Sequence, residues 1–87
     1  MRFLVESALN IPPTPEILAL IPAESARGVE LDTQGVRECL YLAADMSRAW
    51  QVFKADSPEA VEEILQSFPL VPYTASTITA LAEPQAG

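Results

Sequence analysis

One carboxylate in this sequence, Glu24, occupies a place where an apolar side chain would be expected. The interior stripe of a predicted helix consists, turn by turn, of Ile17, Leu20 or Ile21, Glu24, Gly28 and Leu31. Gly28 carries no side chain and could leave a cleft one turn after Glu24. Apolar surroundings disfavour an ionised carboxylate and raise its pKa toward neutrality. A general base that removes a proton next to a carbonyl group needs this property, so Glu24 is the candidate catalytic residue.

Two structural explanations of Glu24 stay open. Pro22 should kink the helix or restart it, and a shift of one residue in helical phase would place Glu24 in water. A helix that restarts at Pro22 would also favour a negative charge close to its positive end.

Five further residues are candidates for contact with a substrate. Tyr41, Trp50 and Tyr73 could form aromatic walls for a flat ring, although each could equally belong to a small core. Arg48 begins a predicted strand and could hold an anionic group, or it is a solvated charge at a strand end. Glu6 could be a second carboxylate of the site, although a structural pair with Arg48 across the sheet or a dimer is the simpler interpretation.

The composition excludes several classes of function. The chain has 87 residues, a formal net charge of −7 and no histidine. No basic stripe is present for nucleic acid or an anionic membrane, and no run of about 18 apolar residues could span a bilayer. Without histidine there is no Ser-His-Asp arrangement and no histidine ligand for haem iron. The carboxylates show no metal-binding spacing, so we expect neither a metal nor a cofactor.

The single cysteine, Cys39, cannot form an intrachain disulfide, which is typical of a reducing compartment. No signal peptide is visible at the start of the sequence. We therefore expect a cytoplasmic protein in which Cys39 is a buried, unreactive thiol.

The pattern of apolar and turn-forming residues predicts the element order βαββαβ. Strands are expected at residues 2–8, 36–44, 48–55 and 74–82, and helices follow the caps Thr14 and Ser57, the first closing at Gly35. The run Phe68–Tyr73 contains Pro69 and Pro72 and should leave the second helix as extended, largely buried chain. This order is that of a ferredoxin-like α+β domain with a four-stranded antiparallel sheet, expected over residues 1–83 with a tail at 84–87.

Both faces of the predicted sheet are apolar. In the second strand Leu40 and Leu42 alternate with Cys39 and Tyr41, so neither face is polar. Two helices cover only one face, and an exposed apolar face marks an interaction surface. We therefore expect a homodimer in which two sheets pack face to face.

The sequence resembles muconolactone isomerase and its relatives, which form dimeric α+β barrels and assemble into larger rings. The segments that carry the resemblance are Ile64–Tyr73, Asn10–Pro13, Glu24, Glu30–Gly35 and Ile78–Leu81. The match at Glu24 implies a role for this residue in the site.

Three positions depart from the family pattern. Tyr41 and Leu42 stand where relatives have tryptophan and arginine, and Glu6 stands where the isomerase has arginine. Arginine is the natural clamp for the carboxylate of muconolactone, so a different substrate is expected.

Two functions follow from these observations. The first is a cofactor-free isomerase in which Glu24 shifts a proton on a small cyclic or lactone-type organic molecule. The alternative is a non-catalytic oligomeric module that binds a small molecule or serves in assembly and has lost the active site of its relatives.

Overall fold

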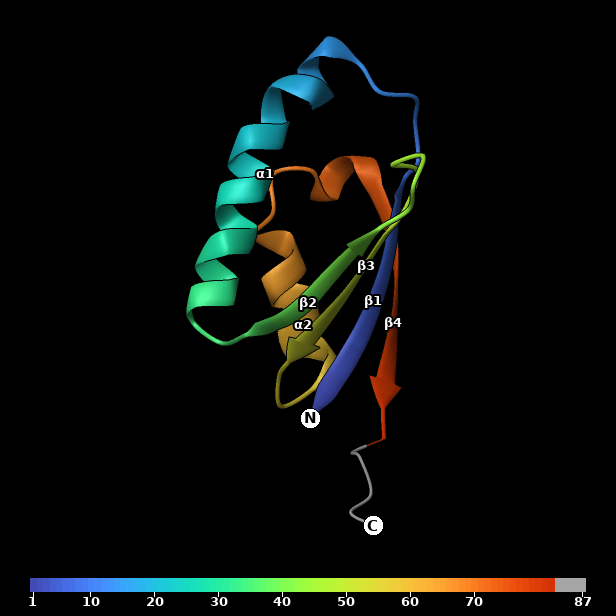
Figure 1. Ribbon diagram of the computed structural model, residues 1–87. Coiled ribbons are helices and arrows are strands. Elements are labelled where there is room, and N and C mark those ends of the chain that lie inside the picture. The colour runs from blue at the N-terminus through green and yellow to red at the C-terminus, as the bar shows by residue number, and fades with distance from the viewer. Residues whose placement is uncertain (83–87) are drawn as a thin grey trace.

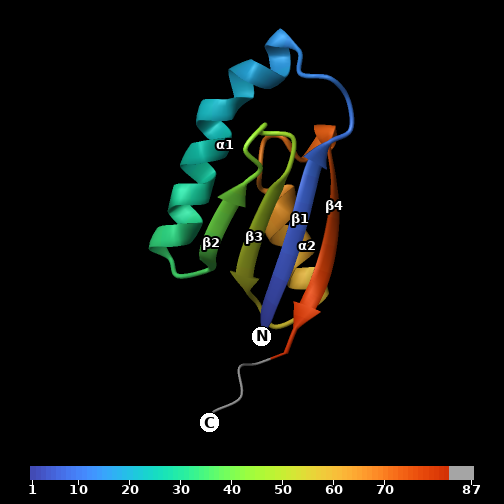
Figure 2. The same ribbon diagram turned by 45° about the vertical axis from the view of Figure 1, so that its right-hand side comes forward.

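Two helices lie on one side of a four-stranded antiparallel sheet in the computed structural model, which describes residues 1–82 (Figure 1, Figure 2). The elements are β1 (Arg2–Leu9), α1 (Pro15–Thr33), β2 (Arg37–Leu42), β3 (Ala49–Lys54), α2 (Pro58–Gln66), the 3₁₀ turn η1 (Val71–Tyr73) and β4 (Thr74–Leu81). The strand order β2-β3-β1-β4 places β1 and β3 at the centre. The predicted ferredoxin-like α+β fold is confirmed, whereas the expected tail at 84–87 lies outside the described residues.

Helix α1 begins and ends at the residues that the sequence indicates. The hydroxyl of Thr14 accepts a hydrogen bond from the Ile17 N–H at 3.2 Å, and Pro15 occupies the first turn. The helix closes before Gly35, which has a φ of +74°.

The predicted restart of α1 at Pro22 is wrong, because one helix runs from Pro15 to Thr33. Proline removes a single hydrogen bond, the one that the Leu18 carbonyl would accept. Leu18 and Pro22 are both exposed, so water can satisfy that carbonyl.

The hydrophobic core fills the space between the sheet and the two helices. Its buried members are Phe3, Val5, Leu31, Phe53, Val61 and Phe68. The rings of Phe53 and Phe68 meet edge to face, with centroids 6.4 Å apart and planes at 63°. Phe68 thereby fixes the connection after α2 to the central strand β3.

The connection between α2 and β4 differs from the extended chain that its prolines predict. Residues Val71–Tyr73 form a 3₁₀ turn, in which the Tyr73 N–H donates to the Leu70 carbonyl at 2.9 Å. Pro72 is accommodated because the first turn of a helix needs no N–H at that position.

Strand β2 contains a bulge that sorts its side chains between the two faces. Arg37 pairs with Phe53 and Cys39 with Val52, which leaves Glu38 as the extra residue. Arg37, Leu40 and Leu42 therefore lie on the helix side, whereas Cys39 and Tyr41 lie on the open face of the sheet. Leu40 and Leu42 are nevertheless 41% and 50% exposed, so the helices leave the end of β2 uncovered.

Replacement of Gly35 by alanine tests the helix stop. No atom lies within 4 Å of a Cβ built at Gly35, so the cost arises from the backbone alone. We expect Gly35→Ala to lower the free energy of unfolding by about 1–2 kcal/mol in urea titrations at fixed protein concentration. Gln34→Ala, at the neighbouring right-handed position, is the control and should stay within about 0.5 kcal/mol of wild type. Equal effects of the two substitutions would contradict the explanation.

Candidate functional site

The Glu24 carboxylate lies half-buried on the helix side of the sheet. One of its oxygens, Oε1, accepts a hydrogen bond from the Leu70 N–H at 2.9 Å. Burial away from water raises the pKa of Glu24, while the Leu70 hydrogen bond and the charge of Arg37 act in the opposite direction. The raised pKa that the sequence predicts for Glu24 therefore has a basis in the structure.

The segment between α2 and β4 supplies the Leu70 N–H. Two turns shape the segment: the Val71 N–H donates to the Phe68 carbonyl at 3.2 Å, and the Tyr73 N–H donates to Leu70. The buried ring of Phe68 anchors its beginning. Reasoning from the sequence did not find Leu70, because a backbone N–H carries no signal in the residue type.

A second cluster of polar groups surrounds Arg37, which the sequence analysis did not single out. Arg37 Nε and Nη2 donate to the two carboxylate oxygens of Asp32 at 2.7 and 2.9 Å, and Nη1 donates to Gln51 Oε1 at 3.0 Å. The Arg37 side chain is only 9% exposed. Asp32 lies at the end of α1 and Gln51 is buried on β3, so Arg37 connects the helix to two strands.

The hydrogen bonds from Arg37 hold the pKa of Asp32 below its usual range. Asp32 is half-exposed, so water screens much of this interaction. The pair therefore serves chiefly to fix the direction of the guanidinium.

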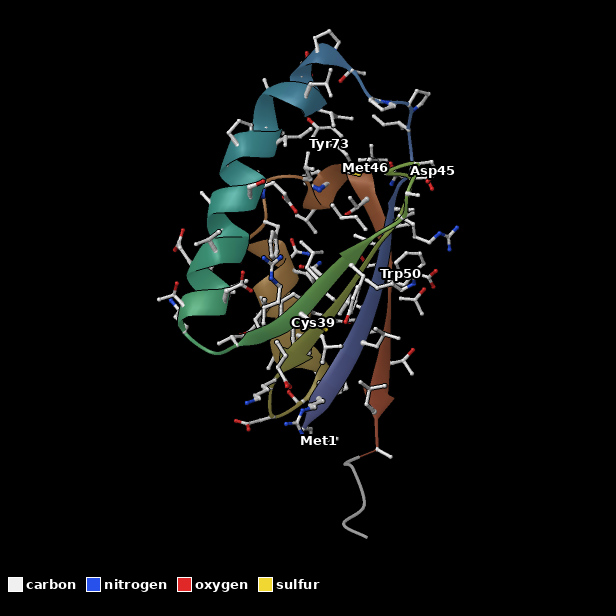
Figure 3. All side chains as sticks on the ribbon, in the orientation of Figure 1. Met1, Cys39, Asp45, Met46, Trp50 and Tyr73 are labelled. Atoms are coloured by element: carbon white, nitrogen blue, oxygen red, sulfur yellow. The ribbon has the colours of Figure 1, made fainter. Side chains whose placement is uncertain are left out.

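Apolar side chains and one phenol accompany Glu24 on the helix side. Ile21 on α1 is 44% exposed. Leu40 and Leu42, at the uncovered end of β2, are exposed to a similar degree. Tyr73 lies on the helix side at the end of η1 (Figure 3).

The other predicted substrate contacts lie on the opposite face. Tyr41 and Trp50 are register partners on the open face, where Trp50 points away from the helices (Figure 3). Arg48 Nη1 bonds Glu6 Oε1 at 2.6 Å on the same face, which is the cross-sheet pair that the sequence suggests. Within one chain the sheet therefore separates these four residues from Glu24, and of the five predicted contacts only Tyr73 shares its side.

Among the depressions on the surface of the described residues are two shallow ones that do not include Glu24. One is lined on the open face by Glu6, Ala43, Ala44, Asp45, Ser47, Arg48 and Trp50. The other lies where α1, α2 and the sheet meet, and its charged members include Arg27, Lys54 and Glu63. Residues 1–82 contain no cluster of three side chains suited to a metal ion, and no helix among them is long and apolar enough to cross a membrane.

Comparison with known proteins gives one family and several similar structures. The family described as muconolactone delta-isomerase matches residues 1–86. No curated protein sequence matches the chain at a significant level.

Two of the similar solved structures cover nearly the whole chain. A muconolactone isomerase crystal structure has a TM-score of 0.84 and 23% identity, over 100% of this chain and 94% of that one. The 5-chloro-2-hydroxyhydroquinone dehydrochlorinase from Burkholderia phenoliruptrix AC1100, solved with 2,5-dihydroxybenzoquinone, has a TM-score of 0.68 and 15% identity, over 97% and 96%. At these identities the likeness extends to the fold alone.

The raised pKa of Glu24 predicts how the free energy of unfolding depends on pH. The folded chain binds this proton more tightly than the unfolded chain, where the pKa is near 4.5. The contribution of Glu24 to stability is therefore complete below pH 4.5 and is lost as the pH rises through the raised pKa. We expect the unfolding free energy of wild type, minus that of Glu24→Gln, to fall in urea titrations as the pH rises from 4.5.

Glu62→Gln is the matched control for this measurement, because it removes the same charge from an exposed position on α2. A difference between wild type and Glu24→Gln that rises with pH, or that follows the Glu62→Gln control, would contradict the assignment.

Proposed function

The chain belongs to the muconolactone delta-isomerase family, and from this premise we propose that it is a cofactor-free isomerase that shifts a proton on a small cyclic or lactone-type organic molecule. The observation that carries the proposal is the half-buried Glu24 carboxylate with its raised pKa. A carboxylate whose pKa is raised in this way is a stronger base than an ordinary exposed carboxylate, as a general base requires.

The proposed reaction needs only one protein group to move the proton. The Leu70 N–H holds Glu24 Oε1, so the second carboxylate oxygen, Oε2, is the one that takes the proton. The electron pair of the broken C–H bond passes into the neighbouring carbonyl system as an enolate. Glu24 then returns the same proton to another carbon of that system, so the product has the composition of the substrate and no oxidant or reductant is consumed.

Exposed apolar surface on the same side of the sheet as Glu24 supports a substrate with an apolar ring. Leu40 and Leu42 present exposed apolar surface on the helix side of β2, and Leu42 occupies the position at which the family resemblance places arginine. The dehydrochlorinase of similar fold was solved with a dihydroxybenzoquinone, a flat ring with carbonyl groups. We include such rings, with lactones, in the proposed substrate class.

We propose that two copies of the chain pair through the open face of the sheet, with assembly into a larger ring possible from such dimers. Leu4 and Val52 lie at the centre of that face, and Tyr41 on β2 is 67% exposed in a single chain. Glu6 and Arg48 neutralise each other there, so a second copy meets no net charge from this pair. In such a dimer, the substrate contacts proposed for Trp50, Glu6 and Arg48 would depend on the partner copy.

A non-catalytic binding or assembly module is the second candidate. The observation in its favour is that two depressions on the described surface lie away from Glu24. In that case the sheet and helices would serve self-association, and Glu24 would only complete the hydrogen bonding of Leu70. A location in the cytoplasm stays a prediction under either function.

Substitution of Glu24 separates the two functions. Lactones and quinone-like rings that raise the melting temperature of the wild type identify ligands of the folded state. For such a ligand, we expect Glu24→Gln to reduce the rate of isomerisation, or of exchange of its acidic C–H in D₂O, by about 100-fold or more. The variant should keep its circular dichroism spectrum and its ligand-induced shift. Unchanged turnover in the purified variant would remove Glu24 as the base and favour the module.

A charge placed on the open face tests the proposed dimer. We expect wild type to sediment as a dimer or larger species at micromolar concentration and Val52→Lys to sediment as a monomer, because a lysine at the centre of the interface would be buried without a partner. Val29→Lys is the control, since Val29 lies 58% exposed on α1 and should leave assembly unchanged. A monomeric wild type, or equal sedimentation of both variants with wild type, would contradict a dimer through this face.

A further inference from the structure

The guanidinium of Arg37 packs against the α1 backbone at Gly28, a contact that we call the Gly28 seat. It exists because residue 28 is glycine. A Cβ built at Gly28 would approach both Nη1 and Nη2 of Arg37 to 2.7 Å and Cζ to 2.9 Å. Such distances are too short for any side chain, so the guanidinium rests directly against the helix. Glu24 precedes Gly28 by four residues and Asp32 follows it by four, which puts both carboxylates on the same helical face as the seat.

At this position the Arg37 guanidinium lies between two carboxylates, those of Asp32 and Glu24, and interacts with them differently. Asp32 takes two hydrogen bonds from Arg37 in a bidentate pair. Glu24 forms no ion pair with Arg37 in the described part of the chain, and its carboxylate accepts a hydrogen bond from the Leu70 N–H instead. A direct pair would occupy the oxygen that a base must keep free, whereas a fixed charge one turn away acts through space.

On the premise that Glu24 is the proposed base, we propose that Arg37 is a positioning residue: the Gly28 seat, Asp32 and Gln51 hold its positive charge beside Glu24, so that the carboxylate stays ionised without being bound. The nearly complete burial of the Arg37 side chain strengthens this field, because water has little access to the guanidinium. Gln51 from the neighbouring strand prevents the guanidinium from turning toward Glu24.

Besides Arg37, few groups affect the ionisation of the Glu24 carboxylate. The segment from Phe68 to Tyr73 contributes the Leu70 N–H and the titratable phenol of Tyr73. On α1 itself, Arg27 is directed to Ser67 and Glu30. The charge of Arg37 lowers the Glu24 pKa against the larger effect of burial, which agrees in sign with the geometry.

Titration of the Glu24 side-chain carboxyl carbon by NMR in the full chain tests this arrangement. We expect Arg37→Met to shift the Glu24 titration to higher pH, because the stabilising charge is lost. Gly28→Ala should shift it in the same direction, since the added methyl displaces the guanidinium. Asp32→Asn should shift it to lower pH, because Arg37 then loses the carboxylate that offsets its charge. Arg27→Met removes an equal charge from the same helix and is the control, which should shift the titration less than Arg37→Met because Arg27 is directed to Ser67 and Glu30.

Opposite shifts in Arg37→Met and Asp32→Asn are a result that a purely structural role would not produce. An unmoved Glu24 titration in folded Arg37→Met, or a shift of the same sign in Asp32→Asn and Gly28→Ala, would overturn the proposal. If Arg37→Met does not fold, Gly28→Ala and Asp32→Asn still decide it. The readout does not require turnover, so failure of the Arg37 proposal is distinct from failure of Glu24 as a base, which the activity of Glu24→Gln decides. In an active enzyme the acid limb of the kcat/KM profile should move with the NMR titration.

Discussion

The arrangement of the helix side depends on the close approach of α1 to β2, and a missing side chain makes that approach possible. Gly28 admits the Arg37 guanidinium against the helix backbone, and the bonds from Arg37 to Asp32 and Gln51 then join α1, β2 and β3. Glu24 lies one turn along the same helix and receives both the low polarity of this interior and the charge of Arg37. The packing of α1 against β2 and the electrostatic environment of Glu24 therefore both depend on the contact between Gly28 and Arg37.

Local patterns in the sequence were sufficient to predict the elements and the environment of Glu24. Helical periodicity placed Glu24 on the interior stripe, and the caps at Thr14 and Ser57 marked both helix starts. Contacts between distant segments were not predictable in this way. The bond from Leu70 to Glu24 spans 46 residues of sequence, and the seat for Arg37 depends on a bulge at Glu38 that sets which face the arginine occupies.

The fold of this chain says less about its function than the side chains of the candidate site do. Similar structures with 23% and 15% identity share this architecture, yet a shared fold supports unrelated reactions. The chemistry proposed for this chain rests on a few side chains, of which Glu24 and Arg37 occupy the helix side. The open face, with Trp50 and the Glu6–Arg48 pair, is physically separated from them by the sheet.

The bulge at Glu38 also bears on how the protein avoids aggregation. Strand β2 is at the edge of the sheet and carries exposed Leu40, Tyr41 and Leu42, a combination that invites a foreign strand to add. An extra residue disrupts the regular spacing of N–H and C=O groups that such a strand would need. The other edge, β4, has an unbroken register with β1 along its whole length. Fibril-like growth, if it were provoked by partial unfolding, should therefore start at β4.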